Sequence, residues 1–200
     1  MSNATTPMAA MVFDLDGTLI DSAPDIHAAV NRLLAEERRP TLDLSTIISF
    51  VGNGLPHLVD LVMKARDLPT NQHADLTQRT LDHYNAMNGT LTRVFPGVEQ
   101  ALNTLMERGH PMAICTNKPE APASHILEHL GLDRYVQAVI GGDSLPVRKP
   151  DPAPLHAAFA ALGAATGLYV GDSEVDAETA ERAGVPFLLF TEGYRKSPVV

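Results

Sequence analysis

The stretch Met8-Ala9-Ala10-Met11-Val12-Phe13-Asp14-Leu15-Asp16-Gly17-Thr18 changes abruptly from apolar to acidic. The apolar run predicts a buried strand that ends in a polar loop. Asp14 and Asp16 follow at the carboxyl end of that strand, where open parallel sheets bind ligands. Two carboxylates so close repel each other, and a hard divalent cation with oxygen ligands offsets that repulsion. This stretch therefore predicts a metal-dependent site, with a solvated surface turn as the alternative.

Four further apolar runs predict strands, and helical patterns lie between them. The expected strands cover residues 111–116, 136–140, 167–171 and 186–190, and the expected helices cover residues 97–108, 120–130, 152–162 and 175–183. A glycine suited to a left-handed C-cap follows each helix: Gly109, Gly131, Gly163 and Gly184. Alternating strands and helices predict an α/β fold, a parallel sheet with helices on both faces.

Residues 22–87 interrupt this alternation. Their apolar residues recur at helical spacing, and the segment contains no convincing buried strand. We expect four short helices, at residues 22–39, 41–50, 54–66 and 70–87. This pattern predicts a helical domain of residues 21–91, inserted into an α/β domain of residues 8–20 and 92–200.

Polar residues also follow other predicted strands. Thr116 and Asn117 offer a hydroxyl and backbone N–H groups, which are neutral donors for a phosphate. Lys149 lies in a proline-stiffened segment before a helix. Asp172 and Asp176, four residues apart, place two carboxylates near the start of another helix. Because the carboxyl ends of parallel strands share one edge of a sheet, these side chains are expected to converge.

Composition restricts the classes of partner. The 200-residue chain carries a formal net charge of −9, which argues against a broad nucleic-acid surface. Its single cysteine, Cys115, forms no internal disulfide and is expected to be a small core residue. We see no signal peptide and no apolar membrane span, so we expect a cytoplasmic protein. The expected partner is a small phosphorylated metabolite, with no membrane or nucleic acid, and the expected state is a monomer or homodimer.

In order along the chain, the sequence contains an acid pair after a strand, Thr-Asn after a strand, a Lys before a helix, and Asp-x-x-x-Asp after a strand. From Met11 to Gly193 this arrangement closely resembles the haloacid dehalogenase superfamily. The resemblance implies a Rossmann-like core with a helical cap domain inserted after the first strand.

The resemblance also implies roles for individual residues. Asp14 would attack phosphorus and form an aspartyl-phosphate, with Asp16 acting as general acid and then general base. Mg²⁺ would be held by Asp14, the backbone carbonyl of Asp16, and Asp172. The remaining roles concern substrate and support: Thr116, Asn117 and Lys149 would hold the transferring oxygens, Asp176 would orient Lys149 or support the metal's water shell, and Thr18 would brace the acid pair beside the substrate.

Asp16 and the cap loop indicate the substrate class. Dehalogenating relatives lack the second acid, so its presence favours phosphate ester chemistry. The loop Val51-Gly52-Asn53-Gly54-Leu55 and the segments 95–98, 115–119 and 141–143 resemble phosphoglycolate phosphatases. Gly52 and Gly54 would let the backbone approach a short ligand, and Asn53 would donate to its carboxylate, unless this loop is merely a turn before a helix.

Three alternatives remain open from the sequence. Phosphatases for other sugar phosphates share much of the pattern. A β-phosphoglucomutase-like phosphomutase would use the same acid pair to move phosphate between sugar positions. A protein that retained the fold only for binding would be expected to lack Asp14 or Asp16, and both are present.

Overall fold

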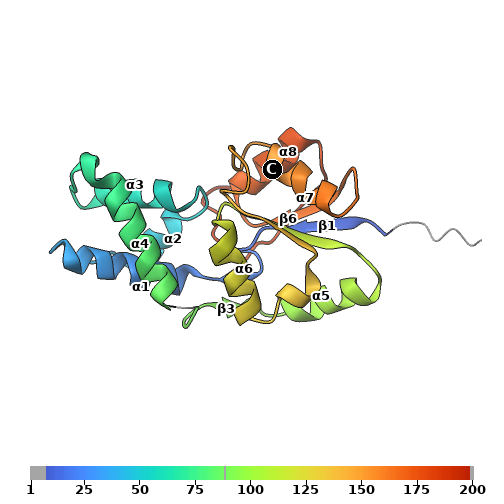
Figure 1. The fold of residues 1–200 in the computed structure, drawn as a ribbon, viewed down its shortest axis with the longest axis horizontal. Coiled ribbons are helices and arrows are strands. Elements are labelled where there is room, and N and C mark those ends of the chain that lie inside the picture. Colours follow the sequence, from blue (N-terminus) through green and yellow to red (C-terminus); the bar gives the residue numbers. More distant parts are fainter. Residues whose placement is uncertain (1–7, 88, 199–200) are drawn as a thin grey trace, which may run out of the picture.

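The computed structural model describes residues 8–87 and 89–198, which contain a central five-stranded parallel sheet (Figure 1). The strand order is β5-β4-β1-β6-β7. The strands are β1 (Ala10–Phe13), β4 (Met112–Cys115), β5 (Ala138–Ile140), β6 (Gly167–Gly171) and β7 (Phe187–Leu189). β1 is central, with Met11 in register with both Met112 and Leu168. The predicted parallel α/β sheet is therefore confirmed, with strands one or two residues shorter than expected at some ends.

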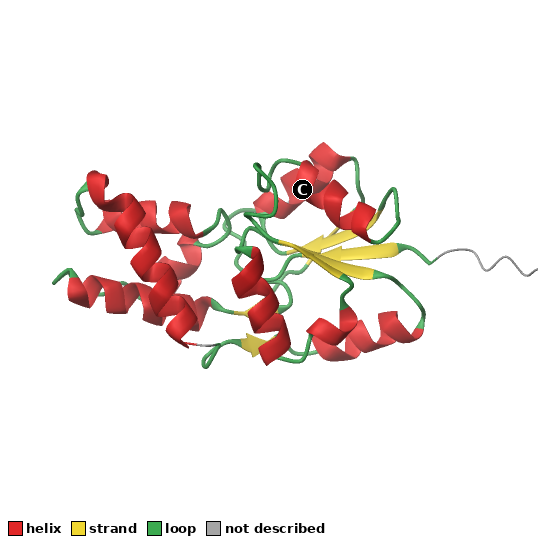
Figure 2. Cartoon of the chain, in the orientation of Figure 1, coloured by secondary structure: helices red, strands yellow, loops and turns green. Residues whose placement is uncertain are grey.

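Helices cover both faces of this sheet (Figures 1 and 2). One face carries α5 (Val98–Glu107) and α6 (Glu120–His129), and the other carries α7 (Ala153–Ala161) and α8 (Glu174–Ala183). The side chains of β1 alternate between two hydrophobic clusters, with Met11 and Phe13 in the α5–α6 cluster and Ala10 and Val12 in the α7–α8 cluster. The four glycines expected after these helices all have positive φ. Cys115 is buried in the α7–α8 cluster, as a core residue should be.

The helices between residues 23 and 87 form a separate group at one end of the sheet (Figure 1), whereas a short 3₁₀ helix, η2 (Asp133–Tyr135), belongs to the sheet side. They are α1 (Ala23–Glu36), α2 (Leu44–Phe50), α3 (Leu55–Ala65) and α4 (His73–Met87), with a short 3₁₀ helix, η1 (Thr70–Gln72), before α4. This helical group has its own hydrophobic cluster, which includes Leu33, Ile47, Val59 and Leu76. Within the described residues, no helix is both long and apolar enough to cross a membrane.

A two-stranded antiparallel ribbon joins the helical group to the sheet. β2 (Ile20–Asp21) pairs with β3 (Arg93–Val94), so both crossings of the chain run side by side. The sequence predicted the two domain boundaries here, after residue 20 and after residue 91, but no strand at either; residue 88, within the predicted helical domain, lies outside the described residues. Strands of two residues are too short to show the alternating pattern by which strands are recognised, so this ribbon was missed.

Candidate active site

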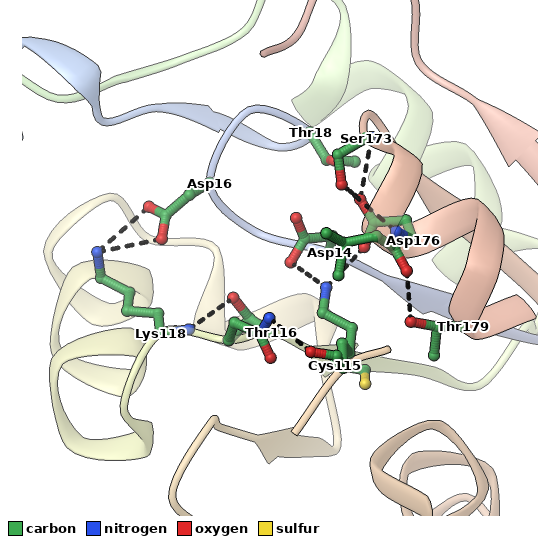
Figure 3. Close-up of polar contacts among 12 residues, drawn as sticks. Asp14, Asp16, Thr18, Cys115, Thr116, Lys118, Ser173, Asp176 and Thr179 are labelled. Atoms are coloured by element: carbon green, nitrogen blue, oxygen red, sulfur yellow. Dashed lines mark hydrogen bonds and ion pairs between the residues drawn. The ribbon is translucent and has the colours of Figure 1, made fainter. Parts of the chain in front are cut away.

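Five predicted site residues meet where the strands of the sheet end. Asp14 and Asp16 follow β1, and Thr116 follows β4 (Figure 3). Asp172 follows β6, and Lys149 lies just before α7. The parallel sheet brings these loops to one edge, because all five strands point the same way. Asp14, Thr116, Lys149 and Asp172 are buried. The spatial grouping expected from the sequence is therefore present.

Lys149 connects two of the acids. Its Nζ donates to Asp14 Oδ1 at 2.8 Å and to Asp176 Oδ1 at 2.6 Å. A third bond, of 2.8 Å, joins it to the hydroxyl of Tyr169, which in turn donates to Asp176 Oδ1. Burial disfavours a charge on Lys149, but the two carboxylates outweigh it and raise the pKa of the ammonium above its ordinary value. Lys149 is therefore a fixed cation beside Asp14.

Asp176 is fully engaged by the protein. Besides Lys149 and Tyr169, it accepts bonds from the backbone N–H and the hydroxyl of Ser173, which caps α8 in return. Burial opposes its ionisation, but Lys149 outweighs that effect and lowers the pKa of Asp176. Both carboxylate oxygens are thus used in holding Lys149 and the start of α8.

Asp172 is held by two groups. Thr18 Oγ1 donates to Asp172 Oδ1 at 2.8 Å, and the backbone N–H of Tyr194 donates to Asp172 Oδ2 at 2.6 Å. The sequence suggested that Thr18 braces the Asp14–Asp16 pair, whereas its hydroxyl bonds to the acid after β6. Thr18 therefore links the loop after β1 to Asp172.

Gly17 makes this close approach possible. Its φ is +90°, a conformation that other residues rarely adopt. A Cβ atom at this position would lie 2.6 Å from Asp172 Oδ2 and 2.8 Å from the ring of Tyr194. Only glycine lets the loop after β1 pass so near Asp172.

The buried acids fit a divalent cation. Carboxylate oxygens of Asp14, Asp172 and Asp176 lie within 4.8 Å of one another, with Lys149 as their buried cation. Burial, followed by repulsion from neighbouring acids, raises the pKa of Asp14 to about 8 and that of Asp172 to about 6. A hard cation with oxygen ligands would relieve both effects. Asp14 and Asp172 are the better candidates for direct ligands, because Asp176 already accepts bonds from Lys149, Tyr169 and two groups of Ser173, whereas Asp172 accepts two bonds and Asp14 one.

Asp16 faces a second cation that sequence reasoning did not single out. Lys118 Nζ lies 3.2 Å from Asp16 Oδ1 and 3.3 Å from Asp16 Oδ2 (Figure 3). The same ammonium donates to the hydroxyl of Tyr84 on α4 at 2.7 Å. Ser22 Oγ also donates to Asp16 Oδ1, at 2.5 Å. Asp16 is therefore oriented by residues of both the sheet side and the helical group.

A cavity lies between the helical group and the sheet. Asp14, Asp16, Thr116, Asn117 and Lys118 line its sheet side. The helical group contributes mainly apolar side chains and the loop glycines: Ile26, Val51, Gly52, Gly54, Leu55, Leu58, Leu81 and Tyr84. The cavity therefore has the two carboxylates that follow β1 on one side and a mostly apolar wall on the other.

The predicted cap-loop residues differ in their placement. Gly52 and Gly54 line the cavity, whereas Asn53 is not among its lining residues. The carbonyl of Gly52 accepts a 2.9 Å bond from the side-chain amide of Asn117, which also donates to the carbonyl of Lys149. Asn117 thus uses its side chain to dock the loop of the helical group against the sheet.

Sequence reasoning missed Tyr169, Tyr84 and Lys118 as site residues. Lys118 had a signal, since it directly follows Thr116 and Asn117 in the loop after β4. Tyr169 occupies a strand position that looks like ordinary core, and Tyr84 lies on a helix far away in sequence. Neither tyrosine belongs to a local pattern, so only the folded chain brings them to the acids.

Known proteins resemble this chain over almost its whole length. The profile of the haloacid dehalogenase-like hydrolases matches residues 11–190. A phosphoglycolate phosphatase of Cereibacter sphaeroides is 55% identical over 194 residues, covering 96% of this chain and 89% of that protein. One from Rhodobacter capsulatus is 48% identical, covering 95% of this chain and 87% of its own length.

A solved structure extends the similarity to three dimensions. The crystal structure of a predicted phosphoglycolate phosphatase from Haemophilus somnus superposes with a TM-score of 0.88 at 29% identity, covering 96% of this chain and 89% of that one. Sequence profile, sequence relatives and fold all agree over nearly the whole chain. The protein therefore belongs to the haloacid dehalogenase-like hydrolase family.

Proposed function

We propose that this protein is a Mg²⁺-dependent cytoplasmic phosphatase that hydrolyses 2-phosphoglycolate to glycolate and phosphate. The observation that carries the proposal is the arrangement of Asp14 and Asp16 on one cavity, with Lys149 bonded to the first acid. The phosphoglycolate phosphatases that share about half of this sequence support the choice of substrate.

In the first step, an oxygen of Asp14 forms a bond to phosphorus while the bond from phosphorus to the ester oxygen breaks. Asp16 gives its proton to the departing glycolate oxygen. In the second step, Asp16 takes a proton from water, whose oxygen attacks phosphorus and releases Asp14. The net reaction consumes one water and returns both carboxyl groups to their starting states.

The remaining residues hold the reacting groups. Lys149, the hydroxyl of Thr116 and the backbone N–H of Asn117 bind the transferring oxygens, and Asp176 orients Lys149. Asp14, the backbone carbonyl of Asp16 and Asp172 would hold Mg²⁺, whose positive charge would offset the repulsion between the nucleophile and the phosphate. Thr18 supports Asp172 in that role.

The two structural units have separate tasks in this proposal. Residues 8–20 and 92–200 form the catalytic core, and residues 21–91 form a cap that closes over the substrate. The cavity between them, with Gly52 and Gly54 on the cap side, supports this division. The contact from Asn117 to Gly52 is one that closing and opening would make and break.

Phosphate release from a panel of monoesters in the presence of Mg²⁺ tests the proposal. We expect kcat/KM for 2-phosphoglycolate to exceed that for hexose and pentose phosphates by about 100-fold, equivalent to ~2.7 kcal/mol in transition-state binding. Equal values across the panel would overturn the substrate assignment. Transfer of phosphate between sugar positions without net release would instead indicate a phosphomutase.

A further inference from the structure

Lys118 provides a cation in the wall of the cavity. Among the described residues that line the cavity, it is the only one with a positively charged side chain. The side chain is 7% exposed, so its charge acts in surroundings with little water. Opposite it, the cap presents apolar residues such as Leu55, Leu58 and Leu81. A buried cation in such a wall favours an anionic group on the ligand.

The ammonium has capacity for one more partner. It carries three donors. One bonds to Tyr84 at 2.7 Å, and a single bifurcated donor serves both oxygens of Asp16, at 3.2 and 3.3 Å, which leaves the third donor for a ligand. The hydroxyl of Tyr84 accepts its bond from Lys118, so its own hydrogen is free to be donated elsewhere. Together these groups offer two donors, one charged and one neutral, which matches the two oxygens of a carboxylate.

The distance between Lys118 and Asp16 determines how long a leaving group can be if its carboxylate is to contact Lys118. A general acid must lie within hydrogen-bond reach of the leaving oxygen, so that oxygen sits beside Asp16. Lys118 Nζ is 3.2 Å from the same carboxylate. In a phosphorylated two-carbon hydroxy acid, a single methylene separates the leaving oxygen from the carboxylate carbon. The carboxylate of such a leaving group therefore falls next to Lys118.

We propose that Lys118 and Tyr84 form a carboxylate subsite that selects short phosphorylated 2-hydroxy acids over uncharged phosphate esters. This inference rests on the proposed phosphatase function and names the residues that bind the carboxylate of the leaving group. Lys118 comes from the loop after β4 and Tyr84 from α4 of the cap. The subsite is thus complete only when the cap lies over the core, which links recognition of the carboxylate to closure. Asn53, which the sequence suggested for this task, does not line the cavity.

The test compares two substrates in each variant, because Lys118 also contacts Asp16 and its loss could slow every reaction. We measure kcat/KM for 2-phosphoglycolate and for ethyl phosphate, which has the same leaving oxygen and no carboxylate. Lys118→Met should lower the ratio of the two values by about 100-fold, and Tyr84→Phe should lower it by about 10-fold. Lys118→Arg should retain most of the preference. The matched controls, Lys64→Met on the exposed face of α3 and Tyr135→Phe in the core, should leave the ratio unchanged.

The outcomes separate this inference from the proposed function. If wild-type enzyme prefers 2-phosphoglycolate and Lys118→Met slows both substrates equally, Lys118 only positions Asp16 and the subsite is wrong. If wild-type enzyme hydrolyses both substrates equally well, the proposed substrate fails and the subsite fails with it. Should Lys118→Met not fold, the Tyr84→Phe ratio decides, and an unchanged ratio there overturns the subsite.

Discussion

The buried carboxylate of Asp25, near the start of α1, accepts hydrogen bonds from both the backbone N–H and the hydroxyl of Thr92, at 2.8 and 2.5 Å. The backbone N–H of Leu91 adds a longer bond to the same carboxylate. Asp25 lies in the first turn of α1, and Thr92, 67 residues further along the chain, lies directly before β3. This contact reinforces the β2–β3 ribbon and fixes where the helical group begins.

Asp25→Asn should destabilise the protein, because an amide N–H₂ group replaces one carboxylate oxygen. That oxygen accepts from the three donors that face Asp25: the N–H of Leu91 and the N–H and hydroxyl of Thr92. We expect a loss of roughly 2 kcal/mol in the free energy of unfolding, measured by urea denaturation. Asp43→Asn is the matched control, since Asp43 caps α2 at the surface and Asn caps equally well. A loss no greater than in the control would show that the contact does not anchor the helical group.

Lys149→Met should abolish turnover and lower stability together. It removes the cation that Asp14 and Asp176 share, and loss of one partner from a buried ion pair typically costs about 3–5 kcal/mol. Lys64→Met removes an exposed lysine paired with Asp60 and should change neither property. Unfolding curves and phosphate release on both variants provide the comparison. Full activity in Lys149→Met would contradict the placement of Lys149 beside the nucleophile.

Thr18→Val should weaken Mg²⁺ binding while preserving the fold. The substitution removes the bond that orients Asp172, and loss of such a supporting contact typically lowers metal affinity by about 10- to 100-fold. Titration calorimetry with Mg²⁺ measures the change. Thr179→Val serves as the control, because among the described residues the buried hydroxyl of Thr179 bonds to its own helix, at the carbonyl of Val175. Equal affinities in the two variants would argue against Asp172 as a ligand.

Much of this architecture could be predicted because each signal is local. A strand followed at once by Asp14 and Asp16, or by Thr116 and Asn117, needs only a few neighbouring residues to be recognised. Parallel strands then place these loops together without any knowledge of side-chain contacts. The fold and the acid cluster therefore follow from short patterns and one rule of topology.

The features that were missed depend on contacts between distant residues. Tyr84 reaches Lys118 across 34 residues, and Tyr169 reaches Lys149 across 20, and neither tyrosine belongs to a motif. Thr18 was expected to serve its own loop but bonds to Asp172, 154 residues away. Such partners meet only when the whole chain packs, so they cannot be predicted from the spacing of residues along the sequence.

Chelation of Mg²⁺ should stop turnover reversibly, and re-addition of Mg²⁺ should restore it. Ca²⁺ should restore it poorly, because its larger and more flexible coordination shell disturbs the in-line geometry of attack. Phosphate release before and after dialysis against a chelator measures both effects. Turnover that survives exhaustive chelation would show that the reaction does not require Mg²⁺.

Trapping the phosphorylated enzyme tests directly whether Asp14 is the nucleophile. Enzyme quenched during turnover is treated with borohydride, which reduces an aspartyl-phosphate to homoserine, and peptides are then sequenced by mass spectrometry. We expect homoserine at position 14 alone, and none in Asp14→Asn or in enzyme without substrate. Homoserine at another aspartate, or its absence from turning-over wild-type enzyme, would contradict the mechanism.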